Sequence, residues 1–332
     1  MPMRLIEYEG RPLLDLSSYA RKGPGRRDHL STAEIELIGR TVNRVPEVMV
    51  KVLTRGGQNL GAVRGHLEYL DRHGDLEIET DDGQRIGGKG VERELLDDWD
   101  LDIEEDRRRA TLEARPSRSP PKLVHKILFS MPPGTPPQKV LGAVKNFARE
   151  EFGLKHRYAM VLHTDEPHPH VHMVIKAVSE QGERLNIRKA TLREWRRMFA
   201  EQLQREGVAA NATERAARGG SRTHKRDGIY RAYLRGESTH IYDREQAVAT
   251  AIRTGDPEPG DGKNTLRATR REVEAGWHKV SEILVAEGHS ELAGEVKRFV
   301  RVMPVPMTER EQTAARIIGR GHGLYERSPP TR

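Results

Sequence analysis

The chain has 332 residues, with 57 Lys and Arg against 50 Asp and Glu, which gives a formal net charge of 57 − 50 = +7. At roughly 100–200 residues per domain, this length predicts two domains, or one domain with extensions. The chain has no cysteine, which excludes disulfides, Cys-ligated zinc, iron–sulfur clusters and a cysteine nucleophile. No apolar run is long enough for a membrane span, and the charged N-terminus is unlike a signal peptide. We therefore expect a cytoplasmic protein without membrane insertion.

Charge is unevenly distributed along the chain. Residues 75–106 contain 14 acidic and 3 basic residues, a local charge of −11, whereas residues 180–235 contain 14 basic and 7 acidic residues, a local charge of +7. Concentrated basic surface attracts a polyanion, and nucleic acid is the usual one. A solvated basic face without a partner is the alternative.

The N-terminal part reads as a tail followed by a strand and a helix. Residues 1–44 form the predicted tail, with one short helix started by a capping box of Ser31 and Glu34. Residues 46–54 predict a strand, and after a glycine-rich turn residues 60–74 predict a helix that ends at a glycine.

The middle of the chain predicts strands and helices around an acidic insertion. The acidic segment 75–106 contains turn-forming DDG and GGKG and is expected to be an excursion on the surface. Residues 122–131 predict a strand, followed by a helix capped by Thr135 with Gln138 closing the box. Residues 157–178 predict a two-strand hairpin.

The C-terminal part predicts helices. Thr191 and Glu194 are expected to cap one helix, which lies within a domain spanning 45–240. The clearest linker is 255–264, GDPEPGDGKN. Apolar residues then recur at helical spacing, so residues 241–332 predict a mostly helical module.

A cluster of histidines is the most informative pattern. His163, Asp165, His168, His170 and His172 lie within ten residues. His170 and His172 are two apart in a predicted strand and share one face, and His163 ends the partner strand. Three imidazoles on one face predict a divalent-metal site with open positions, where Asp165 accepts the second ring N–H of a ligand. The alternative is a set of unrelated exposed histidines.

Tyr69 does not fit the apolar stripe of its predicted helix. Leu60, Val63, Leu67 and Leu70 form that stripe, and Tyr69 falls about 130–140° from its middle. Alone this describes an ordinary surface tyrosine. Beside a metal that stabilises phosphate charge, the phenol becomes a candidate nucleophile that would form a phosphotyrosine.

Three stretches, VLTRGGQNLGAVRGHLEYLDRHG, HKILFSMPPGT and HTDEPHPHVHMVIK, occur in this order. They resemble the three motifs of conjugative DNA relaxases, which are HUH-type single-strand endonucleases, and most closely the branch that contains the T-DNA border endonuclease. The resemblance covers residues 46–235. It implies an α+β fold, with a central antiparallel sheet flanked by helices and, here, a C-terminal helical extension.

The resemblance also implies roles for individual residues. Tyr69 would be the nucleophile, attacking one phosphodiester at the nick site of a transfer origin and leaving a free 3′ hydroxyl. His163, His170 and His172 would be the metal ligands, with His168 as the substitute ligand. Mg²⁺ or Mn²⁺ is the implied ion, and zinc fits the ligands equally well.

DNA contacts and partners complete these expectations. Ser130 matches the serine of the second motif and is expected to contact DNA near the nick. Basic residues expected to set the salt dependence of DNA affinity are Arg188, Lys189, Arg196, Arg197, Arg215 and Arg218. The implied partners are single-stranded or supercoiled DNA at a transfer origin, an accessory origin-binding protein, a coupling ATPase and a type IV secretion system, with translocation to a recipient cell on the bound DNA.

Three other functions remain open at this point. A rolling-circle replication initiator would use the same chemistry for a different purpose. A metal-dependent hydrolase would use water as its nucleophile, which leaves Tyr69 incidental. A nucleic-acid-binding protein with an inactive site would bind DNA without nicking it.

Overall fold

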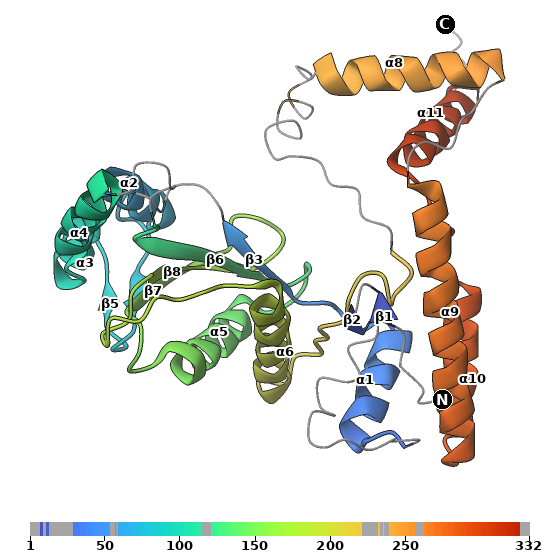
Figure 1. Ribbon diagram of the computed structural model, residues 1–332, viewed down its shortest axis with the longest axis horizontal. Helices are drawn as coiled ribbons and strands as arrows, with labels where there is room; N and C mark the ends of the chain where they lie inside the picture. The colour runs from blue at the N-terminus through green and yellow to red at the C-terminus, as the bar shows by residue number, and fades with distance from the viewer. Residues whose placement is uncertain are drawn as a thin grey trace, which may run out of the picture. The chain divides into compact units, whose positions relative to one another are not determined.

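The computed structural model describes residues 7–8, 11–12, 29–53, 57, 59–114, 121–220, 232, 235, 239–255 and 262–325. The chain divides into two compact units. Unit 1 combines Met1–Arg44 with Thr213–Arg332, and unit 2 is Val45–Ala212. Figure 1 shows the elements of both.

Unit 2 is built on a six-stranded antiparallel sheet in the order β3-β6-β8-β7-β4-β5. The strands are β3 (Met49–Leu53), β4 (Ile78–Thr80), β5 (Arg85–Ile86), β6 (Val124–Ser130), β7 (Tyr158–His163) and β8 (His170–Lys176). The described helices of this unit are α2 (Leu60–Leu70), α3 (Val91–Asp98), α4 (Leu101–Ala114), α5 (Pro137–Phe152) and α6 (Lys189–Arg205). The predicted fold class, α+β with a central antiparallel sheet flanked by helices, is confirmed.

Helices cover the two faces of this sheet unequally (Figure 1). On one face, α5 and α6 pack an aromatic core in which Phe129 lies 5.0 Å from Phe147 and 5.2 Å from Phe199 between ring centroids. On the other face, α2 and α3 pack a smaller cluster that includes Leu67 and Trp99. Aromatic burial of this kind is a main source of stability.

Strand β8 serves both faces because successive side chains alternate. Val171, Met173 and Ile175 enter the aromatic core and are at most 1% exposed. His170 and His172 point to the face that carries α2, as their positions in the sequence predicted. The predicted hairpin is confirmed, with His163 directly opposite His170.

The acidic segment 75–106 is not the expected surface excursion. It forms β4, β5, α3 and the start of α4, and β4 pairs with β7 through Glu79 opposite Met160. Ile78, Trp99 and Leu101 are at most 1% exposed. Acidic residues dominate the composition of this segment, and the few apolar residues between them carry its packing.

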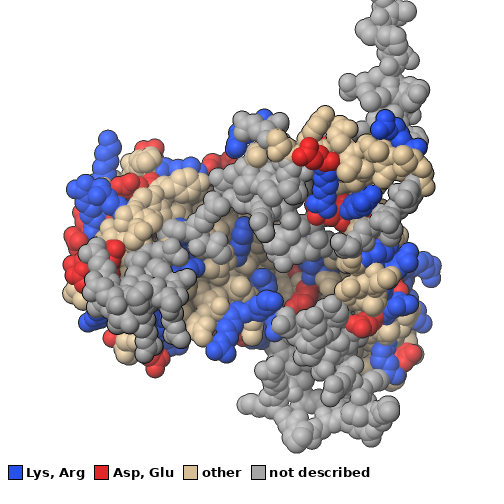
Figure 2. Space-filling model, turned by 45° about the horizontal axis from the view of Figure 1, so that its top comes forward, with Lys and Arg blue, Asp and Glu red and all other residues tan. Residues whose placement is uncertain are grey.

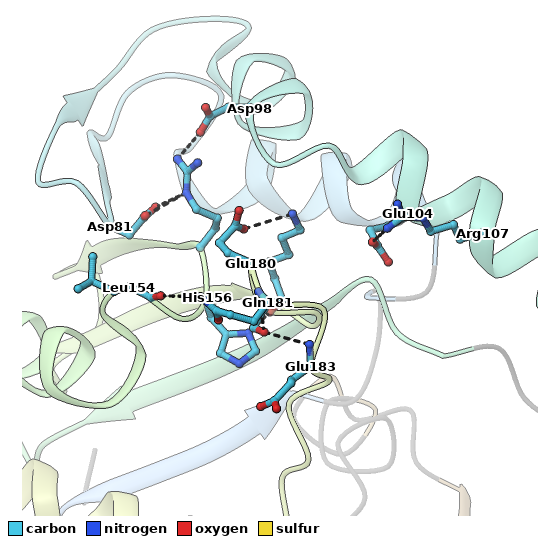
Figure 3. Close-up of polar contacts among 12 residues, drawn as sticks. Asp81, Asp98, Glu104, Arg107, Leu154, His156, Glu180, Gln181 and Glu183 are labelled. Carbon is cyan, nitrogen blue, oxygen red and sulfur yellow. Dashed lines mark hydrogen bonds and ion pairs between the residues drawn. The ribbon is translucent and has the colours of Figure 1, made fainter.

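Ion pairs attach the acidic segment to the rest of unit 2. Arg157, the residue before β7, contacts Asp81 at 2.9 Å and also pairs with Asp98 (Figure 3). Lys145 of α5 pairs with Glu79. Part of the local negative charge is therefore neutralised within the fold.

Helix starts differ in detail from the predicted caps. The capping box of Ser31 and Glu34 is confirmed at α1. Helix α5 begins after Pro136 without a side-chain cap, because the Thr135 hydroxyl donates to the Pro132 carbonyl instead. Helix α6 begins at Lys189, which makes Thr191 its third residue rather than its cap.

Unit 1 is mainly helical. Its described elements are β1 (Glu7–Tyr8), β2 (Arg11–Pro12), α1 (Thr32–Val42), α8 (Thr239–Thr254), α9 (Lys263–Ala286), α10 (Ser290–Arg301) and α11 (Glu309–Tyr325). Helices α1, α9 and α10 share one core, centred on Trp277, whose indole N–H donates to the Ala217 carbonyl at 2.7 Å. Most of the expected linker 255–264 lies outside the described residues. None of the described helices has the length and apolar character needed to cross a lipid bilayer.

Candidate active site

Three histidine rings meet at one end of the sheet. His163 ends β7, and His170 and His172 lie on β8. The ring centroids are 4.8 Å apart for His163 and His172, 5.2 Å for His163 and His170, and 5.3 Å for His170 and His172. The structure thus brings together the three residues that the strand alternation predicted as ligands.

The donor set suits a divalent cation. One ring nitrogen from each residue lies within 4.8 Å of the others. Nitrogens bound to one ion at about 2.1 Å lie at most about 4.2 Å apart, so small side-chain rotations would complete the site. His163 Nε2 faces the Leu70 carbonyl at 2.8 Å, and His170 Nδ1 faces the His168 carbonyl at 2.9 Å. Such outer acceptors fix which nitrogen remains for a metal.

Burial favours the neutral form of two of these rings, His163 and His172. It lowers the pKa of His172 to about 3, helped by the neighbouring His163 and His170. Burial also lowers the pKa of His163, against the opposing effect of its hydrogen bond to Leu70. A neutral imidazole has a free lone pair, so the site is ready to bind a cation near pH 7.

Tyr69 lies on helix α2, and His66 and Leu70 of the same helix contact the triad. The Tyr69 side chain is 55% exposed, as its position off the apolar stripe predicted. Its ring stacks on His66 at 6.4 Å with an interplanar angle of 17°, and His66 lies 6.4 Å from the His172 ring. The helix is also tied directly to the triad, because Leu70 supplies the carbonyl that faces His163.

Asp165 pairs with a different residue from the one expected. Its carboxylate forms an ion pair with Arg72, and backbone carbonyls face the second nitrogens of His163 and His170. The Arg72 charge helps to hold the pKa of Asp165 below its usual range. The predicted hydrogen bond from a ligand ring to Asp165 is not among the contacts of the described residues.

Two other predicted residues lie at the same end of the sheet. Ser130 ends β6 directly opposite His170 in the register and is 5% exposed. Its hydroxyl donates to the Met131 carbonyl at 3.4 Å. The side chain of His168 is exposed and is not part of the three-residue cluster, although its carbonyl supports His170.

The six predicted DNA-binding residues are not gathered at the triad. Arg188, Lys189, Arg196 and Arg197 belong to α6 or its start, and α6 packs on the opposite face of the sheet. Arg215 and Arg218 lie in unit 1. On the face drawn in Figure 2, described Lys and Arg side chains are interspersed with Asp and Glu. The assignment of these six residues to DNA remains a prediction.

Sequence reasoning missed two groups on the triad face. His66 stands one helical turn before Tyr69, and burial, together with the charge of Lys126, lowers its pKa to about 4. Lys126 on β6 is 6% exposed, and burial lowers its pKa to about 8. The i, i+3 spacing of His66 and Tyr69 was the available signal, and Lys126 had none beyond its place in an apolar strand.

A comparison with protein families identifies this fold. Residues 79–208 match the family described as "Relaxase: MobA/VirD2-like, nuclease domain". Residues 79–208 are therefore similar to a relaxase nuclease domain. The match includes the three histidines and Ser130, whereas Tyr69 precedes it. The resemblance predicted from the three motifs is therefore confirmed at the level of the family.

Curated relatives agree with this relaxase domain. The chain is 27% identical over 192 residues to the T-DNA border endonuclease VirD2 of Rhizobium radiobacter, covering 52% of this chain and 43% of that protein. It is 26% identical over 230 residues to the VirD2 of Agrobacterium fabrum, covering 64% and 47%. The chain thus spans less than half the length of these relatives.

One solved structure is also similar, "Molecular Basis of Vancomycin Resistance Transfer in Staphylococcus aureus". It shares 17% identity, covers 29% of this chain and 60% of that chain, and has a TM-score of 0.24. A superposition this loose carries no argument about the relaxase domain.

Proposed function

We propose that this protein is a site- and strand-specific DNA relaxase that nicks single-stranded DNA at a transfer origin and later religates it. The observation that carries this proposal is the direct link between the nucleophile helix and the triad. Leu70, the residue after Tyr69, faces His163 through its carbonyl, and the His66 ring lies 6.4 Å from the rings of both Tyr69 and His172. These contacts support a site that combines the Tyr69 phenol with a cation-binding cluster.

The triad would hold a divalent cation, with Mg²⁺ or Mn²⁺ as the proposed ion. When bound, the cation would neutralise negative charge on the scissile phosphate as it reacts. His163, His170 and His172 would hold the ion, and the two backbone carbonyls keep two of these rings in place.

In the nicking step, the Tyr69 Oη forms a bond to phosphorus and the bond from phosphorus to the 3′ oxygen breaks. The phenolic proton is lost, and the departing oxygen gains a proton to become a 3′ hydroxyl. The 5′ phosphate stays on Tyr69 as a phosphotyrosine. Religation reverses the same bonds, so the two steps need no further reactant.

Other residues would bind the strand. Ser130 stands opposite His170 and is proposed to contact DNA near the nick. The exposed Arg188 and Lys189 are proposed to bind phosphates further along. On this reading the protein starts conjugative or mobilisation transfer with an accessory origin-binding protein, a coupling ATPase and a type IV secretion system.

The test uses oligonucleotides from the DNA that flanks its gene, labelled at either end. The wild-type protein with Mn²⁺ or Mg²⁺ is expected to carry the 3′ label on a denaturing gel and to release a 5′-labelled product with an extendable 3′ hydroxyl. Tyr69→Phe should lose the adduct while DNA affinity stays within a few-fold. Tyr242→Phe is the matched control, since Tyr242 is a 62% exposed tyrosine in unit 1.

Two outcomes would contradict the proposal. An adduct that survives in Tyr69→Phe would remove Tyr69 as the nucleophile. Cleavage by the wild type without any adduct would indicate a hydrolase with a water nucleophile.

A further inference from the structure

The backbone just after α2 adopts a conformation that is unusual for ordinary residues. Arg72 has φ +57° and His73 has φ +60°, and Gly74 follows with φ +96°. Left-handed backbone is unfavourable for residues other than glycine, and residues held in it cluster at functional sites. At Gly74 an added Cβ would lie 2.8 Å from the Gly88 backbone, which fixes the path of the chain at this point.

This turn places the Arg72 side chain against the proposed nucleophile. The guanidinium carbon lies 5.3 Å from the centroid of the Tyr69 ring, within the range of a cation–π contact. His66 and Tyr69 stand at i, i+3 positions on α2, and Arg72 follows the end of the helix at Leu70. The phenol therefore has a ring neighbour on its N-terminal side and a cation on its C-terminal side.

The guanidinium is in turn attached to the loop between the metal-binding strands. Arg72 pairs with Asp165, two residues after His163 and five before His170. The two side chains are 36% and 53% exposed, and exposed ion pairs contribute little to stability. A strained, partly exposed contact of this kind is better explained by positioning than by stability.

We propose that Arg72 is a positioning residue for the nucleophile, anchoring the Tyr69 ring to the histidine loop through Asp165. This inference rests on the proposed function, because it takes Tyr69 as the attacking group. The planar guanidinium is suited to this because it can lie against the ring while its N–H groups bind the carboxylate, which a lysine ammonium cannot do equally well. Small misplacements of a reacting group are costly, at about 100-fold for a shift of 1 Å.

The first measurement is adduct formation with a saturating oligonucleotide. Arg72→Met is expected to lower the rate constant about 100-fold while the oligonucleotide Kd and the Mn²⁺ Kd stay within about two-fold. Arg72→Lys should recover part of the rate. Asp165→Asn should slow the reaction less, and the double variant should be no slower than Arg72→Met, because both changes break one connection. Arg64→Met is the matched control and should react at the wild-type rate, because Arg64 lies on α2 and pairs with Glu68 and Glu92.

The second measurement needs neither DNA nor metal. In the full chain labelled with fluorotyrosine, the ¹⁹F resonance that disappears in Tyr69→Phe is assigned to Tyr69. It should shift in Arg72→Met and Asp165→Asn but not in Arg64→Met, with the melting temperature unchanged.

Each contrary result has a distinct meaning. If Arg72→Met raises the oligonucleotide Kd and leaves the rate constant unchanged, Arg72 is a DNA-binding residue and the inference is overturned. A wild-type rate constant in Arg72→Met, or an unshifted Tyr69 resonance, would also overturn it. A wild-type protein that forms no adduct would defeat the proposed function, whereas the fluorine result would still report on the anchor.

Discussion

The two faces of the central sheet differ in what they bury. Under α5 and α6 the face is a continuous aromatic and aliphatic core, and under α2 it holds three histidines and a buried lysine, while α2 itself carries the exposed Tyr69. Strand β8 contributes alternate residues to both faces. A single strand therefore supplies stability through one set of side chains and candidate chemistry through the other, and the two roles can be separated by mutating adjacent residues.

The largest effect on metal binding is expected from His172→Ala, which changes the triad face of β8. Loss of an outer partner of a ligand costs about 10–100-fold in metal affinity, so loss of the ligand itself should cost at least about 100-fold, with loss of the adduct. His170→Ala should behave alike. Elemental analysis and titration with Mn²⁺ measure the change, and unchanged metal content would contradict the ligand assignment.

Met173→Ala, at the next residue of β8, should lower the stability of the fold and leave metal affinity unchanged. Met173 is 1% exposed in the aromatic core, and such truncations cost about 2–5 kcal/mol in the free energy of unfolding. Urea unfolding should show this loss, while Mn²⁺ affinity at low temperature stays near that of the wild type. Equal loss of metal affinity would show that the two faces are not independent.

Lowering the pH should destabilise the metal-free protein, because each face of the sheet contains a histidine whose pKa is lowered by burial. Burial lowers the pKa of His172 to about 3 and that of His125, on the aromatic face, to about 4, from an ordinary value of 6.5. Between these pKa values and 6.5, the unfolded chain binds more protons than the folded chain. The contribution of these two histidines to the free energy of unfolding is therefore fully present above pH 6.5 and is lost as the pH falls toward 4. Unfolding at pH 7 and 4.5 measures the slope. His125→Gln should flatten it without changing metal affinity.

The smallest effect is expected for the basic residues of α6. Arg188 is exposed, whereas Arg197 pairs with Glu194 and Glu201. Arg188→Gln should therefore flatten the plot of log affinity against log salt by about 0.7 for single-stranded DNA, and Arg197→Gln should flatten it less. Equal slopes for both variants would remove Arg188 from the DNA-binding surface.

Much of this site could be predicted because it depends on local rules. Strand alternation placed His170 and His172 on one face, and hairpin geometry placed His163 opposite His170. Helix periodicity placed Tyr69 outside the apolar stripe. Each inference needed only residues that are close together in the sequence.

The errors came from contacts between distant segments. The acidic segment was expected to be an excursion, yet β4 pairs with β7, and Glu105 accepts a hydrogen bond from the Leu60 N–H at the start of α2 at 3.0 Å. A carboxylate there satisfies a free backbone donor and complements the helix dipole. Asp165 was assigned to a histidine because Arg72, its actual partner, lies 93 positions away in the sequence. The amino-acid composition of a segment does not reveal contacts of this kind.

The place of β5 at the end of the sheet has a consequence for aggregation. This strand is only two residues long and includes Arg85, and short, charged borders discourage two sheets from joining. Removing residues 75–106 would strip away both β4 and β5 and leave the six-residue β7 with unpaired backbone groups along one side. A shortened chain is therefore expected to self-associate, which light scattering would detect.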